Sequence, residues 1–300
     1  MAGETTASND WVGVLLAGGT GSRMMPLTHV VNKHLLPVYD KPMIYYSLST
    51  LMLSGIRDII LVSSPDALPQ FERLLGDGSA WGMTLKYVQQ DTPDGIGGAL
   101  HAASPQFKGR STMVVLGDNI FYRARLSHYL TELMKTNDGA TVIGHSVADP
   151  TAFGVVELDG NGKPIALVEK PKQPRSDLAI PGLYMFDKTL SDIVGDQRKS
   201  ARAEYEITGI LDHYLKSERL KVSLPGRGFA WLDGGTVDDL FEASQFVKLM
   251  SDRTGQLLAS PEEIAWRMGW IHADKARKAV LPFATSPYGE RVLHVIEDKC

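Results

Sequence analysis

Short runs of apolar, often β-branched residues alternate with longer helical stretches through the first half of this 300-residue chain. Runs of about four to eight such residues, separated by helices, are typical of strands in a parallel sheet that is covered on both faces. The expected strands cover residues 11–17, 58–63, 84–89, 112–116 and 140–144, and the expected helices cover residues 43–53, 67–75, 99–103 and 126–137. The pattern therefore predicts an α/β fold with a Rossmann-like, mostly parallel but mixed central sheet between helices.

The pattern changes after Asp149, where antiparallel strands are expected as an insertion in the parallel core. Residues 153–158 and 164–168 flank the sequence Asp-Gly-Asn-Gly, which predicts a β-hairpin with its turn at Asn161 and Gly162. Helices are expected again at 205–216 and 237–250, and the capping-box sequence Ser-Pro-Glu-Glu at 260–263 predicts a further helix start. We therefore expect a disordered tail (1–10), a core (11–255) and a C-terminal helical appendage (256–300).

Composition excludes several classes of protein. The formal net charge is −4, from 31 Lys and Arg against 35 Asp and Glu, which argues against a nucleic-acid partner. Cys300 is the only cysteine, so neither an internal disulfide nor a cysteine zinc site is expected. No apolar run approaches the roughly 20 residues that span a bilayer, and the polar first ten residues do not resemble a secretion signal. These observations predict a cytoplasmic protein with no membrane partner.

A glycine-rich loop follows the first expected strand. Its sequence, Gly-Gly-Thr-Gly-Ser-Arg at 18–23, lets backbone N–H groups form a concave site for phosphate, and Arg23 adds a planar cation. The loop matches neither familiar phosphate-binding motif, because the lysine of a Walker A loop is absent and Met24 stands where a Rossmann fingerprint requires glycine. On its own, the loop fits a purely structural turn equally well.

More specific evidence comes from a series of motifs in a fixed order. The loop is followed by Lys-His-Leu-Leu-Pro-Val-Tyr-Asp-Lys-Pro-Met at 33–43, Gly-Asp-Asn-Ile-Phe at 117–121, Glu-Lys-Pro-Lys at 169–172 and Gly-Arg-Gly-Phe-Ala-Trp-Leu-Asp at 226–233. Shorter motifs lie at 75–79, 93–95, 153–157, 182–184, 206–208 and 262–266. With this series, residues 11–289 resemble the sugar-1-phosphate nucleotidyltransferases, and among them the glucose-1-phosphate thymidylyltransferases.

The resemblance implies a reaction and the residues for it. Such enzymes join a nucleoside triphosphate to a sugar 1-phosphate and release pyrophosphate; dTTP is the first expectation here, and UTP or another triphosphate the second. Residues 11–120 would form the nucleotide-binding half and residues 121–255 the sugar-binding half. The implied nucleotide-binding residues are Leu16, Gly18, Gly19, Gly21, Arg23, Gln90 and Gly95. The implied sugar-phosphate-binding residues are Asn119, Gly154, Glu169, Lys170, Ile180, Tyr184 and Arg202.

The resemblance also implies Mg²⁺ as cofactor, with Asp118 and Asp233 as its ligands. The expected catalytic residues are Arg23, Lys33, Asp118, Lys170 and Asp233. Because the relatives assemble as homotetramers, a homo-oligomer is expected here as well.

The residue types suit this chemistry. The attacking phosphate oxygen is already ionised near neutral pH, since the second pKa of a phosphate monoester is about 6, so no general base is required. Positioning and charge stabilisation dominate such transfers, and cations are needed around the crowded phosphates. Asp118 and Asp233 end the apolar runs 113–118 and 229–233, and ligand sites in open α/β sheets lie at the carboxyl ends of strands. Outside this context, an Asp after a strand would more often start a turn.

Several residues depart from the thymidylyltransferase pattern. Pro181 stands where threonine is usual, Gly234 replaces a threonine beside the metal aspartate, and Gly97 and Gly98 replace Ala-Gln. These changes fit either neutral drift or a site reshaped for a sugar phosphate other than glucose 1-phosphate, or for a wider range of substrates. Two other classes are weaker alternatives. A catalytically silent nucleotide-sugar-binding homologue is disfavoured because all five catalytic residues are present, and a dinucleotide-dependent oxidoreductase is disfavoured by Met24.

Overall fold

The computed structural model describes residues 10–200 and 202–298, and within these ranges seven strands form one central sheet. The sheet order is β14-β8-β13-β6-β1-β4-β5. The strands are β1 (Trp11–Leu16), β4 (Asp58–Ser63), β5 (Thr84–Gln89), β6 (Ser111–Leu116), β8 (Ala140–Ile143), β13 (Leu183–Phe186) and β14 (Leu220–Ser223). Strand β13 is antiparallel to β6 and β8, and the other strand pairs of the central sheet are parallel. The predicted mixed, mostly parallel sheet is confirmed.

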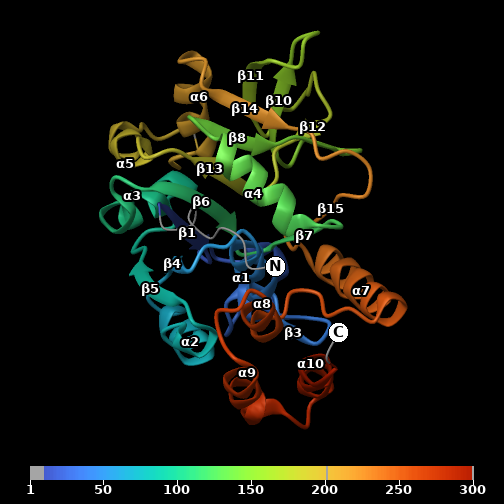
Figure 1. Ribbon diagram of the computed structural model, residues 1–300. Coiled ribbons are helices and arrows are strands. Elements are labelled where there is room, and N and C mark those ends of the chain that lie inside the picture. The colour runs from blue at the N-terminus through green and yellow to red at the C-terminus, as the bar shows by residue number, and fades with distance from the viewer. Residues whose placement is uncertain (1–9, 201, 299–300) are drawn as a thin grey trace.

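Successive side chains of a strand point to opposite faces of the sheet, and here the side chains on both faces are apolar. Helices cover each of the two faces. In β1, Val12 and Val14 pack into the core on one face, and Leu15 packs into the core on the other. The first face is covered by α3 (Ile96–Phe107), α5 (Leu190–Ile193) and α6 (Ile207–Lys216). The second face is covered by α1 (Ile44–Leu53), α2 (Leu68–Leu75), α4 (Leu126–Thr136) and the C-terminal helices, as the layers in Figure 1 show.

A four-stranded antiparallel sheet extends the fold beyond the edge of the central sheet. Its order is β11-β10-β12-β9, with β9 (His145–Ser146), β10 (Gly154–Leu158), β11 (Pro164–Glu169) and β12 (Leu178–Ala179). The predicted hairpin is present, but its turn is longer than expected. The Asp159 N–H donates to the carbonyl of Lys163 (2.8 Å), and Gly162 takes the left-handed conformation (φ 82°). The connection is therefore a three-residue loop with a glycine bulge rather than a two-residue turn.

Two short antiparallel pairs were not expected from the sequence. One joins β7 (Asn119–Tyr122) to β15 (Ala230–Asp233), and the other joins β2 (Pro37–Val38) to β3 (Lys41–Pro42). Beside them, α7 (Val237–Thr254) starts with a reciprocal capping box between Thr236 and Asp239. The β7–β15 pair carries residues of the candidate site.

The predicted C-terminal helical appendage comprises α8 (Pro261–Arg267), α9 (Ala273–Val280) and α10 (Pro287–Glu297), which lie at the end of the molecule opposite β10 and β11 (Figure 1). The expected capping box is only half formed. The Ser260 hydroxyl accepts from the N–H of Glu263 (3.3 Å), but the Glu263 carboxylate pairs with Arg267 instead. The Tyr288 hydroxyl donates to the buried Glu262 (2.5 Å), which ties α10 to α8.

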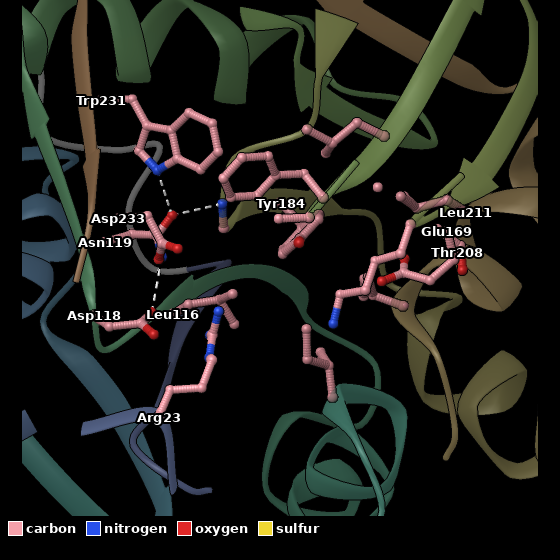
Figure 2. Close-up of a pocket in the computed structure, with 18 residues that line it drawn as sticks. Arg23, Leu116, Asp118, Asn119, Glu169, Tyr184, Thr208, Leu211, Trp231 and Asp233 are labelled. Atoms are coloured by element: carbon pink, nitrogen blue, oxygen red, sulfur yellow. Dashed lines mark hydrogen bonds between the residues drawn. The ribbon is translucent and has the colours of Figure 1, made fainter. Parts of the chain in front are cut away.

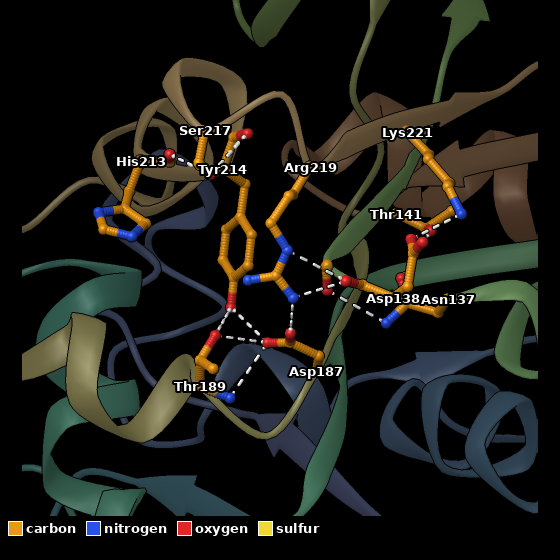
Figure 3. A network of polar contacts seen from close by, with 11 residues as sticks. Asn137, Asp138, Thr141, Asp187, Thr189, His213, Tyr214, Ser217, Arg219 and Lys221 are labelled. Atoms are coloured by element: carbon orange, nitrogen blue, oxygen red, sulfur yellow. Dashed lines mark hydrogen bonds and ion pairs between the residues drawn. The ribbon is translucent and has the colours of Figure 1, made fainter.

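A polar network fixes the β14 edge of the central sheet (Figure 3). The Asp187 carboxylate accepts from the hydroxyls of Thr189 (2.6 Å) and Tyr214 (3.1 Å) and pairs with Arg219. The Arg219 guanidinium also donates to the carbonyl of Asp138 (2.6 Å). The network thereby joins the end of β13, helix α6 and the starts of β14 and β8.

Residues 1–9 of the predicted tail, and Cys300, lie outside the described residues. Asp10, which was assigned to the tail, is held at β6, where its carbonyl accepts from the N–H of Ser111 (3.1 Å). None of the helices in the described ranges has the length and apolar character needed to cross a bilayer. The domain boundaries stay a prediction.

Candidate active site

Two adjoining cavities lie at the carboxyl end of the central sheet. The larger, of about 430 Å³, is bordered by the glycine loop, and the smaller, of about 170 Å³, by β10, β11 and β13. Ile96, Leu116 and Asp118 line both cavities. Two molecules bound side by side would thus meet at Asp118, at the sheet edge where ligand sites of open α/β folds lie.

The cavities collect most of the residues implied by the resemblance. The larger cavity is lined by Leu16, Gly18, Gly19, Gln90, Gly95 and Asp118. The smaller cavity is lined by Arg23, Asp118, Asn119, Gly154, Glu169, Lys170, Ile180, Tyr184 and Asp233. Three implied residues, Gly21, Lys33 and Arg202, line neither cavity.

The glycine loop requires its glycines for backbone conformation and for space. Gly19 and Gly21 are left-handed, with φ of 102° and 60°. The Thr28 hydroxyl donates to the carbonyl of Gly21 (2.7 Å), and a Cβ on Gly21 would lie 2.8 Å from the Thr28 Cγ2. Gly21 therefore supports the loop from behind, while Gly18 and Gly19 face the larger cavity.

One asparagine holds the two candidate metal ligands together. Pairing of β7 with β15 sets Asn119 opposite Asp233, and the Asn119 amide Nδ2 donates to Oδ1 of Asp118 (2.8 Å) and Oδ1 of Asp233 (3.4 Å). The Asn119 Oδ1 accepts from Trp231 Nε1 (2.7 Å) and the Gly182 N–H (2.9 Å) (Figure 2). All four hydrogen-bonding positions of the amide are occupied. Asn119 therefore has no position left for a sugar hydroxyl unless one of these contacts breaks.

The two carboxylates have opposite electrostatic environments. Burial opposes ionisation of Asp118, but the ion pair with Lys33 outweighs burial and holds the pKa of Asp118 below its usual value. Burial and the neighbouring Asp118 charge raise the pKa of Asp233 well above its usual value. His34 is buried behind this pair, and burial, with the Lys33 charge, lowers its pKa to about 3, so the imidazole is neutral. Asp233 is thus a buried carboxylate whose charge is poorly compensated by the protein.

Glycines after β15 allow groups of the site to approach closely. The Gly234 N–H donates to the carbonyl of Asp118 (2.8 Å), and a Cβ on Gly234 would lie 2.7 Å from the Met43 Cε. A Cβ on Gly235 would lie 2.8 Å from Oδ2 of Asp233 and 3.1 Å from an Arg23 guanidinium nitrogen. Gly234 is therefore packed against Met43, and Gly235 lets Arg23 approach Asp233.

Glu169 and Lys170, two of the residues implied for the sugar phosphate, line the smaller cavity, where Figure 2 shows Glu169 on the side opposite Asp118 and Asn119. Burial and the nearby Glu206 raise the pKa of Glu169. The Arg202 guanidinium forms a bidentate pair with Glu206 (2.7 and 3.0 Å) and reaches Glu169 at 3.4 Å. Lys170 follows Glu169 in a left-handed conformation (φ 44°), and its N–H donates to the carbonyl of Phe153 (3.0 Å). Arg202 is thus occupied by carboxylates and lies behind the cavity wall.

The sequence interpretation assigned no role to Trp231, Thr208 or Phe153, all of which line the smaller cavity. Trp231 stacks edge-on against Phe153, with ring centroids 4.8 Å apart. All three residues lie inside motifs that carried the resemblance, at 153–157, 206–208 and 226–233, so these motifs were a signal for their involvement. Their roles depend on contacts between distant segments, such as the bond from Trp231 to Asn119.

Comparisons with known proteins find relatives over nearly the whole chain. Residues 12–249 match the family model described as nucleotidyl transferase. A glucose-1-phosphate thymidylyltransferase of Mycolicibacterium smegmatis is 45% identical over 285 residues, which cover 95% of this chain and 99% of the relative. The enzyme of the same name from Neisseria gonorrhoeae is 44% identical over 284 residues, with the same coverage of each chain.

Two solved structures share the fold. A crystal structure from Bacillus anthracis, described as a glucose-1-phosphate thymidylyltransferase in complex with a sucrose, superposes with a TM-score of 0.73 at 37% identity. It covers 79% of this chain and 94% of its own. A UDP-glucose pyrophosphorylase complexed with UDP-glucose superposes with a TM-score of 0.69 at 22% identity, covering 79% and 98%.

Proposed function

This chain belongs to the nucleotidyl transferase family and is a nucleotidyltransferase, and from this premise we propose that it transfers a thymidylyl group from dTTP to glucose 1-phosphate or a related hexose 1-phosphate. The products are a dTDP-hexose and pyrophosphate, and UTP is the second candidate donor. One observation carries the assignment of sites: the glycine loop borders the larger cavity, acidic and basic side chains line the smaller one, and Asp118 lines both. We assign the nucleotide to the larger cavity and the sugar phosphate to the smaller.

The donor set at Asp118 and Asp233 fits Mg²⁺. A single amide holds the two carboxylates together, and the Asp233 charge is poorly compensated, so a hard cation would be stabilised between them. The described residues contain no cluster of three or more His, Cys, Asp or Glu side chains arranged for a metal. Mg²⁺ tolerates such a sparse set, because it usually keeps several waters and takes phosphate oxygens as further ligands. When bound, the ion would neutralise phosphate charge.

The proposed reaction is an in-line displacement at the α-phosphorus. An ionised oxygen of the sugar phosphate forms a bond to this phosphorus, the bond to the oxygen that bridges the α- and β-phosphates breaks, and pyrophosphate leaves with the electron pair. Lys33 itself lines neither cavity, but it is paired with Asp118, which lines both, and the α-phosphate would lie beside this pair during attack. Its charge would stabilise the transition state, where negative charge accumulates.

Arg23 and Lys170 would bind phosphate groups of the two substrates at a distance from the reacting α-phosphorus. Arg23 follows the glycine loop and lines the smaller cavity close to Asp233. We assign it to the β- and γ-phosphates, which requires the triphosphate to extend from the larger cavity past Asp118. Lys170 lines the smaller cavity beside Glu169, so we assign Lys170 to the sugar phosphate and Glu169 to the sugar hydroxyls. Arg202 would reach the sugar phosphate only by leaving Glu206, and until then it neutralises the acidic wall. A cytoplasmic location and assembly as a homotetramer belong to the same proposal and rest on the family resemblance.

Pyrophosphate release over a matrix of substrates tests this function. The full-length protein is assayed with dTTP, UTP, dCTP, ATP and GTP, each with glucose, galactose and mannose 1-phosphates, in Mg²⁺ and in EDTA. We expect release with dTTP or UTP and at least one hexose 1-phosphate in Mg²⁺, and none in EDTA. No release from any pair would contradict the proposal, and full activity in EDTA would remove the metal from it.

A further inference from the structure

Gly98, one of the residues that depart from the family pattern, makes room for a carboxylate. It lies in the first turn of α3, and its backbone is not left-handed, so conformation alone does not demand glycine there. A Cβ on Gly98 would lie 2.0 Å from Oδ1 and 2.6 Å from Cγ of Asp94. Glycine weakens a helix, so its presence in this turn needs a reason. The reason is space, because the Asp94 side chain folds over the start of α3 where a Cβ on residue 98 would lie.

The carboxylate at this position fixes the orientation of Gln90. The Gln90 amide Nε2 donates to Oδ1 of Asp94 (3.0 Å) and to the carbonyl of Gly95 (3.2 Å). Both amide protons are therefore directed to acceptors. The opposite orientation of the amide would set its oxygen against the carboxylate. Gln90 Oε1 is left 3.1 Å from where a Cβ on Gly18 would lie, and both Gln90 and Gly18 line the larger cavity.

Gly97 holds the same segment from the other side. The Gly97 N–H donates to the carbonyl of Tyr205 (2.8 Å), and the Tyr205 N–H donates to the carbonyl of Asp94 (2.7 Å). A Cβ on Gly97 would lie 2.9 Å from the Tyr205 carbonyl oxygen and 2.1 Å from Oε1 of Gln197. The two glycines therefore leave room for the Asp94 side chain and for the Tyr205 backbone, which holds the Asp94 main chain.

We propose that Asp94 is a positioning residue for base selection: admitted by Gly98, its carboxylate orients Gln90 so that Oε1 accepts a hydrogen bond from the N3–H of thymine or uracil. The inference rests on the proposed function and names the feature of the base that the larger cavity selects. Cytosine has no proton on N3, so an amide fixed with its oxygen toward the base disfavours it. Without Asp94, Gln90 is free to turn its N–H toward cytosine, and the selectivity falls.

The test compares dTTP with dCTP in the full-length protein. Asp94→Ala is expected to lower the ratio of kcat/KM for dTTP to that for dCTP about tenfold, which corresponds to about 1.4 kcal/mol. The KM for the sugar 1-phosphate should stay within about twofold. Calorimetric titration without sugar phosphate should show a similar fall in the ratio of dTTP affinity to dCTP affinity. Asp94→Asn keeps an acceptor oxygen for Gln90 and should restore most of the ratio.

Gly98→Ala gives an independent route to the same change, since its methyl group displaces the Asp94 carboxylate. It should lower the ratio as far as Asp94→Ala does, and the double variant should lower it no further. Gly195→Ala is the matched control, because a Cβ there meets nothing within 4 Å, and it should retain the wild-type ratio.

The outcomes separate the inference from the proposed function. An active wild-type protein that prefers dCTP overturns the positioning role together with the choice of dTTP as donor, but not nucleotidyl transfer itself. An unchanged ratio in Asp94→Ala overturns the positioning role only. If Asp94→Ala does not fold, an unchanged ratio in Gly98→Ala overturns it instead. A wild-type protein that releases no pyrophosphate from any pair contradicts the proposed function itself.

Discussion

Asp118→Asn separates the catalytic role of this carboxylate from its role in folding. The substitution keeps the shape of the side chain and removes the charge that the account places on the metal and beside Lys33. We expect kcat to fall about 10³-fold or more, which corresponds to about 4 kcal/mol of lost transition-state stabilisation. A loss of this size is reasonable because one of two protein ligands of the metal loses its charge.

Two effects on stability oppose each other in this variant. The ion pair with Lys33 is lost, but the repulsion between Asp118 and Asp233 is relieved, and the pKa of Asp233 should fall toward its ordinary value. We expect the free energy of unfolding to change by no more than about 1 kcal/mol, which shifts Tm by about 2–4 °C in a protein of this size. Loss of activity should therefore occur in a folded protein.

Steady-state pyrophosphate release and calorimetry measure the two quantities in the same preparation. Asp58→Asn is the matched control: Asp58 also pairs with a basic residue, Arg110, but it starts β4 at the opposite end of the sheet. The control should keep wild-type turnover. If Asp118→Asn keeps more than about a tenth of the wild-type kcat, or if Asp58→Asn loses as much kcat, the catalytic role of Asp118 is wrong.

Three further substitutions test other parts of the structure. Trp231→Phe removes the indole N–H that donates to Asn119 (2.7 Å) and keeps an aromatic ring. The affinity for Mn²⁺, measured by electron paramagnetic resonance, should weaken about tenfold. An unchanged Kd for Mn²⁺ would contradict the positioning of the carboxylates by Asn119. Asp187→Asn should lower the free energy of unfolding in urea by about 2 kcal/mol at pH 7. Burial opposes ionisation of Asp187, but the hydrogen bonds that it accepts outweigh burial and lower its pKa, so this stability is present above the ordinary carboxyl pKa of about 3.9 and is lost as pH falls through the lower folded value. The difference between wild type and variant should therefore shrink at pH 3, and a difference that grows instead would reverse the sign of the argument. Tyr288→Phe removes a 2.5 Å hydrogen bond to the buried Glu262 and should lower the free energy of unfolding by about 2 kcal/mol, seen as a lower Tm with turnover within twofold; an unchanged Tm would contradict the role of this bond in docking α10.

Much of the central sheet could be predicted from the sequence because its inner strands β1, β4 and β6 are apolar runs that are almost wholly buried, while the edge strand β5 keeps three exposed residues. The predicted strands 58–63 and 84–89 coincide with β4 and β5, and the prediction for β1 is one residue too long. Strands β13 (Leu183–Phe186) and β14 (Leu220–Ser223) were not among the expected strands. The direction of β13 depends on how the chain connects, which its uniformly buried residues do not show. Strands β9 and β12 have two residues each, which is too short for a period to show.

The candidate site could be predicted only as far as local patterns and motifs reach. Asp118 and Asp233 were expected to end strands, and each does follow or end one. Their link through Asn119 depends on the pairing of β7 with β15, across more than 100 residues of chain. That link is set by tertiary packing, which no local pattern records. The contact between Gly98 and Asp94 is local, since the two residues are four apart, but composition and periodicity do not show that the Asp94 side chain folds over the start of α3.

In the proposed reaction, a nucleoside triphosphate in the larger cavity transfers its nucleotidyl group to a sugar phosphate in the smaller cavity, beside Asp118. The most direct measurement is ³¹P NMR of the wild-type protein with dTTP, glucose 1-phosphate and Mg²⁺, with mass spectrometry of the sugar product. We expect a nucleoside diphosphate hexose and pyrophosphate to appear in equal amounts, and neither to form when the sugar phosphate is omitted. Inorganic phosphate released from dTTP at the same rate with or without the sugar phosphate, and no sugar nucleotide, would contradict it.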